Sequence, residues 1–170
     1  ETVSGIRTLD LAVEGGKVRS VTVGMGRAEV SEPIAIDAAG ETLRCIPVSV
    51  GNPHAVTFVE DAEAFPLETI GPAVEHHPAF PGGVNAEFVQ VLGQNRLRMR
   101  VWERGSGITM ACGTGACASA AAAVREGYCG AGVPVTVRLD GGDLAITVGE
   151  DGTVVMTGPA EMIYEGETIE

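Results

Sequence analysis

The sequence has few basic residues. It contains 11 Lys and Arg against 23 Asp and Glu in 170 residues, which gives a formal net charge of −12 at pH 7. Nucleic-acid-binding proteins contact phosphates through clustered Lys and Arg, so this balance argues against that class of protein. One basic cluster remains, the alternating Arg96, Arg98 and Arg100. Their period of two favours a solvated strand face over an anion-binding patch, and the acidic segment 161–170 is interpreted in the same way.

Long hydrophobic runs and paired cysteines are also absent. No stretch approaches the roughly 18 uninterrupted apolar residues of a membrane span, and the first residues, ETVSGIRTLDL, lack a secretory signal pattern. The four cysteines have neither Cys-x-x-Cys nor zinc-ligand spacing: Cys45, Cys112, Cys117 and Cys129. We therefore expect a soluble cytoplasmic protein with reduced thiols, no metal and no membrane partner, because a chain of this length builds a core without disulfides.

Alternating apolar and polar residues predict strands along much of the chain. The segments 9–13 and 97–101 alternate in this way, so each is expected to be a strand with one buried face. Near the end of the chain, turn signals such as Asp-Gly-Gly separate three such runs. They predict an antiparallel meander of strands at about 133–139, 143–148 and 153–157.

Two segments are predicted to be helical. The first, over 65–76, has Pro66 where a first turn accepts proline, and it is stopped by Pro78. The second, over 114–126, ends at Gly127 as its C-cap.

The composition of the second helix suggests the architecture. Its ACASAAAAV content is small and apolar on every side, and a helix without a polar face is buried all round. We expect an α+β fold, a mostly antiparallel β roll or barrel wrapped around this central Ala-rich helix. With no internal repeat or domain boundary, residues 1–170 are expected to form a single lobe.

The segment ERGSGITMACGTGACASAAAAV, from Glu103 to Val124, carries the main chemical signal. Cys112 precedes the second helix, where free backbone N–H groups and the helix dipole favour an anion. This placement predicts a thiolate with a lowered pKa, and a carboxylate-binding site on the N–H groups of Gly113 to Gly115. The alternative is a cysteine that only packs. The other cysteines are interpreted as small buried residues: Cys45, Cys117 and Cys129.

Other polar residues flank glycine-rich turns. Glu103 and Arg104 end a strand and suit the ammonium and carboxylate groups of an amino acid, although a surface ion pair is the alternative. Asn52 and His54 lie in a Gly-Asn-Pro-His segment that is either a simple turn or a place where an imidazole tunes a thiol. Asn85 opens a strand after two glycines.

Five motifs together resemble diaminopimelate epimerase, in that family's order, and the resemblance extends over nearly the whole chain. They are GNPHAV (51–56), VNAEF (84–88), RVWERGSGIT (100–109), ACGTGACA (111–118) and MTGPA (156–160). The resemblance implies an isomerase without PLP or another cofactor that interconverts LL- and meso-2,6-diaminopimelate on the route to lysine and the cell wall. It also implies two lobes with the substrate between them, and homodimers of the full-length protein.

The resemblance assigns roles to residues already singled out. It implies that Cys112 abstracts the α-proton from one face of the substrate, while Gly113 and Thr114 bind the reacting carboxylate. Substrate-contacting positions of the family match Asn52, Asn85, Glu103 and Arg104. Positions that adjust the thiol pKa match His54 and Glu103.

One feature of the family has no counterpart in these 170 residues. Its second catalytic cysteine lies in an N-terminal lobe, in an Asn- and Gly-rich motif that is not found here. A two-base epimerase needs an acid and a base on opposite faces of the α-carbon. We therefore expect the C-terminal lobe of an epimerase, inactive in isolation and completed by the missing N-terminal lobe. Two alternatives stay open: a two-cysteine racemase for another amino acid, and a stand-alone carboxylate-binding module.

Overall fold

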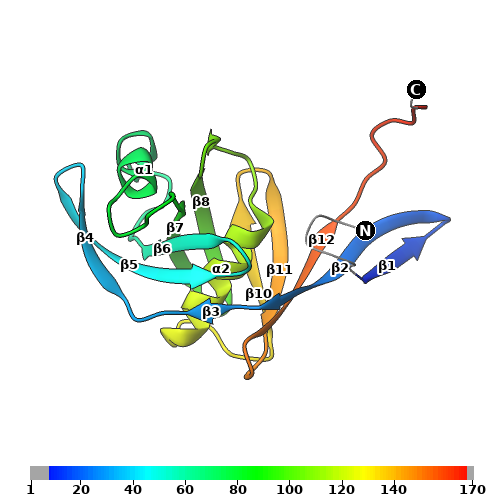
Figure 1. Ribbon diagram of the computed structural model, residues 1–170. Coiled ribbons are helices and arrows are strands. Elements are labelled where there is room, and N and C mark those ends of the chain that lie inside the picture. Colours follow the sequence, from blue (N-terminus) through cyan, green and yellow to red (C-terminus); the bar gives the residue numbers. More distant parts are fainter. Residues whose placement is uncertain (1–7, 168–170) are drawn as a thin grey trace.

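The computed structural model describes residues 8–167, which form a strand-rich body with two helices (Figure 1). The helices are α1 (Leu67–Glu75) and α2 (Gly113–Arg125). The strands are β1 (Leu9–Glu14), β2 (Lys17–Arg27), β3 (Glu29–Val30), β4 (Ile34–Ala38), β5 (Glu41–Ser49), β6 (Pro53–Phe58), β7 (Asn85–Gly93), β8 (Arg96–Glu103), β9 (Gly107–Ile108), β10 (Pro134–Leu139), β11 (Gly142–Val148) and β12 (Thr153–Pro159).

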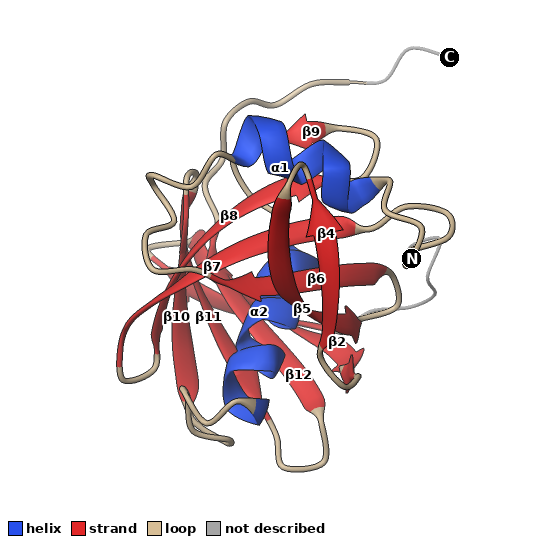
Figure 2. Ribbon diagram, turned by 90° about the vertical axis from the view of Figure 1, so that its left-hand side faces the viewer, coloured by secondary structure: helices blue, strands red, loops and turns tan. Residues whose placement is uncertain are grey.

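The strands form one mixed sheet in the order β1-β2-β12-β11-β10-β8-β7-β6-β5-β3, with β4 on β5 and β9 on β8. The pairs β6 with β7 and β8 with β10 are parallel, and the others are antiparallel. β2 pairs with β12 as far as Arg27, and β3 pairs with β5 from Glu29. The sheet therefore curls back on itself around α2 (Figure 2).

Helix α2 lies inside this roll. All of its residues from Gly115 to Ala123 are buried, in one hydrophobic core with strand residues such as Leu97, Val137 and Ile146. Alanine suits this position because it has high helix propensity and lets the surrounding strands approach closely. The predicted roll around an Ala-rich helix is confirmed, and so is the meander, formed by β10, β11 and β12.

Helix α1 covers the opposite face of the sheet. The predicted helix over 65–76 is confirmed with a later start, at Leu67, and Pro66 is its N-cap residue. Successive residues of a strand point to opposite faces, so Phe88 of β7 packs in the core under α1 while Val89 packs in the core around α2. The approach of α1 to the sheet is close: a Cβ on Gly71 would lie 2.7 Å from Cβ of Trp102. Neither helix within residues 8–167 has the length and hydrophobicity of a membrane span.

The interpretation of the arginine cluster as a solvated strand face is wrong for its central member. Arg98 is only 7% exposed. Its guanidinium bonds to Glu63 at 2.6 Å and to Asp140, and it donates to the carbonyl of Met99 at 3.0 Å. A guanidinium is tolerated in a buried position when its donors are paired in this way. Arg98 therefore joins β8 to the segment before α1 and to the β10–β11 turn.

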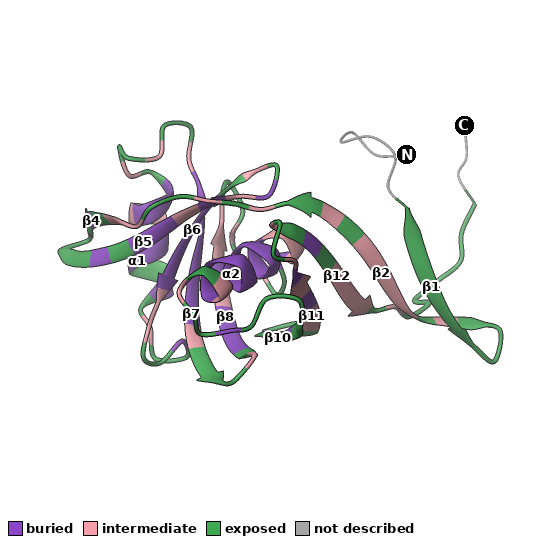
Figure 3. Cartoon of the chain, turned by 90° about the horizontal axis from the view of Figure 1, so that it is seen from below, coloured by how far each residue is buried: buried purple, intermediate pink, exposed green. Residues whose placement is uncertain are grey.

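The prediction of a buried face on the first strand is also wrong for the described residues. Leu9, Leu11 and Val13 are 52%, 53% and 60% exposed. β1 and the first part of β2 project from the body as an arm, so no other described element covers this side of the hairpin (Figure 3). Period-two alternation correctly predicted the strand, but burial requires a partner surface that residues 8–167 do not provide.

Candidate active site

Cys112 is the N-cap residue of α2, in extended backbone conformation with φ −133° and ψ 106°. Its sulfur accepts a hydrogen bond from the backbone N–H of Gly115 at 3.3 Å, and Thr114 Oγ1 lies 3.6 Å from it. The first N–H groups of a helix have no acceptor within the helix, so the Gly113 and Thr114 N–H groups are available to an anion. The predicted position of Cys112 at the helix N-terminus is confirmed.

The prediction of a lowered thiol pKa is wrong for this structure. Cys112 is 6% exposed, and this burial raises the pKa of its thiol to about 11. Hydrogen bonds from Thr114 and Gly115 act in the opposite direction, while the nearby carboxyl groups of Glu87 and Glu103 add to the rise. Loss of hydration therefore outweighs the effect of the helix end, because a buried thiolate has little solvent to stabilise it.

A chain of hydrogen bonds leads from the thiol into the core. Asn52 Nδ2 donates to Thr114 Oγ1 at 3.2 Å, and Asn52 Oδ1 lies 3.0 Å from His54 Nε2. The other ring nitrogen of His54, Nδ1, is 2.6 Å from Oε1 of Glu87. His54 and Glu87 both have side-chain exposures of 0%. His54 therefore reaches Cys112 only through Asn52 and Thr114, since both ring nitrogens are already engaged.

A second set of bonds holds the turn after β8. Asn85 accepts a hydrogen bond from the backbone N–H of Arg104 at 3.0 Å and donates to the carbonyl of Pro53 at 3.0 Å. Glu75, at the end of α1, accepts from the Trp102 indole at 2.6 Å and from the Gly105 N–H at 2.8 Å. These bonds fix the backbone on both sides of the Glu103 and Arg104 side chains.

The side chains of this turn have local partners. Glu103 accepts a hydrogen bond from the hydroxyl of Thr109, and the exposed Arg104 donates to the carbonyl of Gly82 at 3.3 Å. Glu103, the last residue of β8, lies close enough to affect the Cys112 thiol, whereas Arg104 follows in the turn with its guanidinium at the solvent. The alternative interpretation, a surface ion pair between Glu103 and Arg104, has no counterpart among the ion pairs of residues 8–167.

The family model of diaminopimelate epimerase matches residues 46–163 of the chain. The chain belongs to the diaminopimelate epimerase family. It is 47% identical to the diaminopimelate epimerase of Geobacillus thermodenitrificans, over 98% of this chain and 62% of that protein. It is 51% identical to the diaminopimelate epimerase of Phocaeicola vulgatus, over 98% of this chain and 64% of that protein. The chain thus spans a little under two thirds of the length of the curated relatives it matches.

Solved structures of low sequence identity share the fold. A predicted epimerase from Pseudomonas aeruginosa has a TM-score of 0.67 at 21% identity, covering 96% of this chain and 67% of that chain. A hydroxyproline epimerase from Agrobacterium vitis, solved with trans-4-hydroxy-L-proline, has a TM-score of 0.70 at 18% identity. The match covers 95% of this chain and 56% of the Agrobacterium chain. Like diaminopimelate epimerase relatives, both are longer than this chain.

The structure brings together residues from four of the five sequence motifs. Asn52, directly before β6, and His54, in β6, are connected by hydrogen bonds to Thr114 and Cys112 at the start of α2. Glu87 of the motif 84–88 bonds to His54, and the backbone N–H of Arg104 in the motif 100–109 bonds to Asn85. Two residues of this diaminopimelate epimerase family member were missed at the sequence level, Glu87 and Glu75. In the sequence, Glu87 could have been identified as an acidic residue in the middle of an otherwise apolar strand. No sequence feature distinguishes Glu75 from an ordinary surface glutamate. Within residues 8–167, no three His, Cys, Asp or Glu side chains gather as a metal site.

Glycine is required where the chain of hydrogen bonds meets α2. A Cβ on Gly115 would lie 2.8 Å from Glu87 Oε1 and 3.1 Å from Cys112 Sγ. The carboxyl group and the thiol thus both lie where a side chain at position 115 would be, so this diaminopimelate epimerase fold has no room for one there. The remaining cysteines are buried free thiols: Cys45, Cys117 and Cys129.

Proposed function

We propose that this chain provides one acid/base thiol, Cys112, of an epimerase that interconverts LL- and meso-2,6-diaminopimelate. The observation that carries the proposal is the placement of Cys112 at the N-terminus of α2, with its sulfur beside N–H groups that suit a substrate carboxylate. The named activity of the relatives supports the choice of substrate.

The proposed chemistry is proton exchange at the substrate α-carbon. Removal of the α-proton moves negative charge onto the adjacent carboxylate, and the N–H groups of Gly113 and Thr114 lie where they can stabilise that charge. Burial keeps Cys112 in the thiol form, which is the state that donates a proton to the carbanion. The reverse reaction uses the same residue as the thiolate, which then takes the proton back from this face.

Substrate is held, in this proposal, by groups that surround the thiol. The second hydrogen of Asn52 Nδ2, the amide of Asn85 and the Glu103 carboxylate are available to the amino and carboxyl groups of an amino acid. Arg104 provides a guanidinium at the mouth of the site for the distal carboxylate. No cofactor enters this mechanism, since a thiol on each face suffices for proton transfer.

We further propose that the complete protein has a second lobe, and that this lobe covers the arm and provides the opposing acid/base. The relatives are longer than this chain by more than a third of their length, and the arm exposes Leu9, Leu11 and Val13. An apolar surface of this kind is typical of an interaction site. Residues 8–167 alone are therefore expected to lack epimerase activity.

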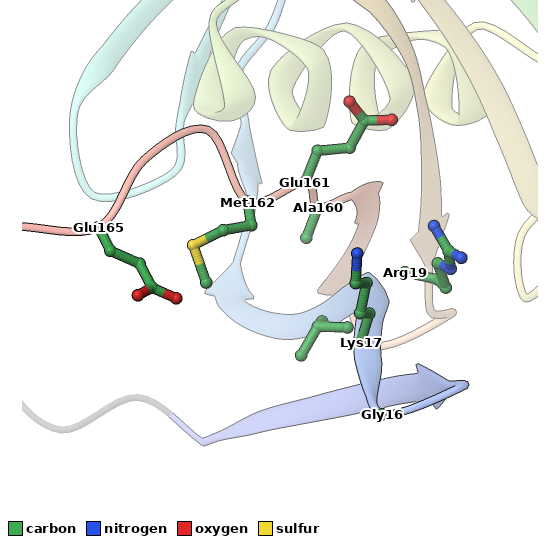
Figure 4. A pocket seen from close by; sticks show the side chains of 8 residues that line it. Gly16, Lys17, Arg19, Ala160, Glu161, Met162 and Glu165 are labelled. Carbon is green, nitrogen blue, oxygen red and sulfur yellow. The ribbon is translucent and has the colours of Figure 1, made fainter.

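The arm also borders a cavity of about 740 Å³ that the second lobe is proposed to fill. Lys17 and Arg19 reach it from β2, and Met162 and Glu165 reach it from the segment after β12 (Figure 4). Met162 is 77% exposed, which is unusual for so apolar a side chain. A lobe that contacts both β2 and this C-terminal segment buries the arm on two sides.

The test is deuterium incorporation from D₂O at the α-carbon of LL-diaminopimelate, compared between the 170-residue chain and the full-length protein. Exchange by the full-length protein, its loss in Cys112→Ala, and no exchange by the chain alone are expected. Deuterium exchange into proline or hydroxyproline but not into diaminopimelate would show that the substrate is another amino acid. Binding of diaminopimelate without exchange by the full-length protein would favour a binding module.

A further inference from the structure

Glu87 has the most deeply buried carboxyl group of the described residues, and the proposed mechanism does not use it. It lies on β7 with 0% exposure, and its Oε2 has no hydrogen-bond partner among residues 8–167. Its Oε1 contacts His54 and points toward Gly115 and the start of α2. An ionised carboxylate without solvent and with one unsatisfied oxygen is costly, so this carboxyl group must share or hold a proton.

The neighbouring amide determines where the protons of His54 lie. Asn52 Nδ2 donates to Thr114 Oγ1, which leaves Asn52 Oδ1 facing Nε2 of His54. An amide oxygen only accepts hydrogen bonds, so Nε2 must carry a hydrogen. The other nitrogen, Nδ1, then shares a proton with Glu87 across 2.6 Å. The Glu87–His54 pair holds two protons in total, either as an ion pair or as two neutral groups.

A hydrogen-bonded chain is also possible with the Asn52 amide reversed, but it leaves an ionised carboxylate buried in the core. Rotation of the Asn52 amide by half a turn would place an N–H at His54 Nε2 and an oxygen at the Thr114 hydroxyl. The pair would then hold one proton, with Glu87 ionised and Oε2 unsatisfied in the core. Desolvation raises the pKa of Glu87, and the contribution of the neighbouring Glu103 carboxylate is in the same direction. Both effects disfavour this arrangement.

The two arrangements differ at the thiol. With two protons on the pair, His54 donates to Asn52, Asn52 donates to Thr114, and the Thr114 hydroxyl is free to donate to Cys112 Sγ, 3.6 Å away. The sulfur then has two donors, this hydroxyl and the Gly115 N–H. With one proton, the Thr114 hydroxyl donates to Asn52 instead, and the sulfur loses one donor. The direction of the chain therefore decides how well a thiolate is stabilised.

We propose that Glu87 is a positioning residue which, by holding a second proton with His54, directs the donors of the chain His54, Asn52, Thr114 toward the Cys112 sulfur. The proposal deepens the proposed function, since it assumes that Cys112 passes through the thiolate during catalysis. Other ionisable groups near the sulfur are Glu103 from β8 and Cys117 from α2, and neither belongs to this chain of donors.

The first measurement is the ¹⁵N NMR spectrum of the His54 imidazole in the unmodified 170-residue chain. We expect Nε2 to be protonated throughout the range of about pH 5 to 8 in which histidines ordinarily titrate. In Glu87→Leu, Nδ1 of His54 has no hydrogen-bond partner in either arrangement of the Asn52 amide. The ¹⁵N shifts of His54 are therefore expected to be averages over its two neutral tautomers. An unprotonated Nε2 in the unmodified chain, or an unchanged His54 spectrum in Glu87→Leu, would overturn the proposal.

The second measurement is the alkylation rate of Cys112 in Thr114→Val, followed by mass spectrometry of its peptide. Loss of a donor to the thiolate is expected to raise the Cys112 pKa by about 0.5 to 1 unit, and so to slow alkylation about three- to tenfold at fixed pH. Thr57→Val is the matched control, because its buried hydroxyl bonds to Cys45 and not to the site. Faster or unchanged alkylation in Thr114→Val refutes the donor direction.

Neither measurement depends on turnover. If the full-length protein has no epimerase activity, the proposed function is refuted, but the His54 spectrum and the effect of Thr114→Val are not affected. Conversely, an active epimerase with an unprotonated Nε2 would refute the role of Glu87 alone.

Discussion

Replacement of Gly71 by alanine tests how tightly α1 is packed and how this packing supports the site. Gly71 lies within α1, where alanine is ordinarily favoured over glycine by about 1 kcal/mol. Here, however, the added Cβ would lie 2.7 Å from both Cβ and Cγ of Trp102. The Cβ atom of Trp102 is bonded to the β8 backbone and does not move when the side chain rotates, so α1 itself must move.

The expected magnitude follows from two opposing contributions. The propensity gain stabilises by about 1 kcal/mol, whereas overpacking a well-packed core typically costs about 1 to 3 kcal/mol. Movement of α1 also lengthens the bonds from the Glu75 carboxylate to Trp102 and Gly105, and hydrogen bonds to a charged group are worth about 1.5 to 3 kcal/mol. We expect a net destabilisation of about 2 kcal/mol, a fall in Tm of roughly 4 to 8 °C.

The assay is urea unfolding followed by tryptophan fluorescence. Trp102 is the single tryptophan of the sequence, so the emission reports directly on this contact. Gly24→Ala is the matched control, because a Cβ there has no heavy atom within 4 Å and the residue is not in the left-handed region. A Gly71→Ala chain that is more stable than the unmodified one, with unchanged emission, would refute the reasoning.

Three further predictions concern single groups. The alkylation rate of Cys112 should rise about tenfold per pH unit up to a pKa near 11; saturation below about pH 8.5 would contradict the effect of burial, with Cys112→Ala identifying the signal. Arg98→Met should destabilise by about 1 to 3 kcal/mol in urea unfolding, because Asp140 is left without its guanidinium, and a neutral result would show that solvent replaces it. Burial raises the pKa of Glu75, but hydrogen bonds led by that of Trp102 bring it below the ordinary 4.5. Its contribution to stability is therefore complete above about pH 4.5 and lost as the pH falls through the lower folded value; Glu75→Gln should abolish that part of the acid dependence in urea titrations.

Most of the fold could be predicted from local patterns. The alanine-rich helix, its start beside Cys112 and the β10–β12 meander follow from residue periodicity and turn residues, which act over a few positions of the chain. Burial was harder to predict. Leu9 and Leu11 have the pattern of a half-buried strand but are exposed, and Arg98 has the pattern of a solvated strand but is buried, because each outcome depends on which distant surface lies opposite.

The candidate site divides in the same way. Glycine-rich motifs identified Cys112, Asn52 and His54 because each motif is contiguous. Glu87 was not identified, since its significance depends on His54, which is 33 residues away in the sequence and adjacent on the parallel strand β6. The direction of the Cys112 pKa was also beyond sequence reasoning, because a helix end and burial act in opposite directions and only the exposed area decides between them.

The sequence by itself determined the family, the roll around a buried helix and the place of the thiol at that helix's N-terminus. These properties depend on patterns of residue type over a few neighbouring positions, such as hydrophobic periodicity and turn residues, which act whatever the distant contacts are. Only the tertiary structure decided that the thiol is desolvated, that Glu87 pairs with His54 while Glu75 holds the turn after β8, and that residues 8–167 leave the arm uncovered. Such outcomes depend on solvent exclusion and on contacts between segments far apart in the chain, which local sequence does not encode.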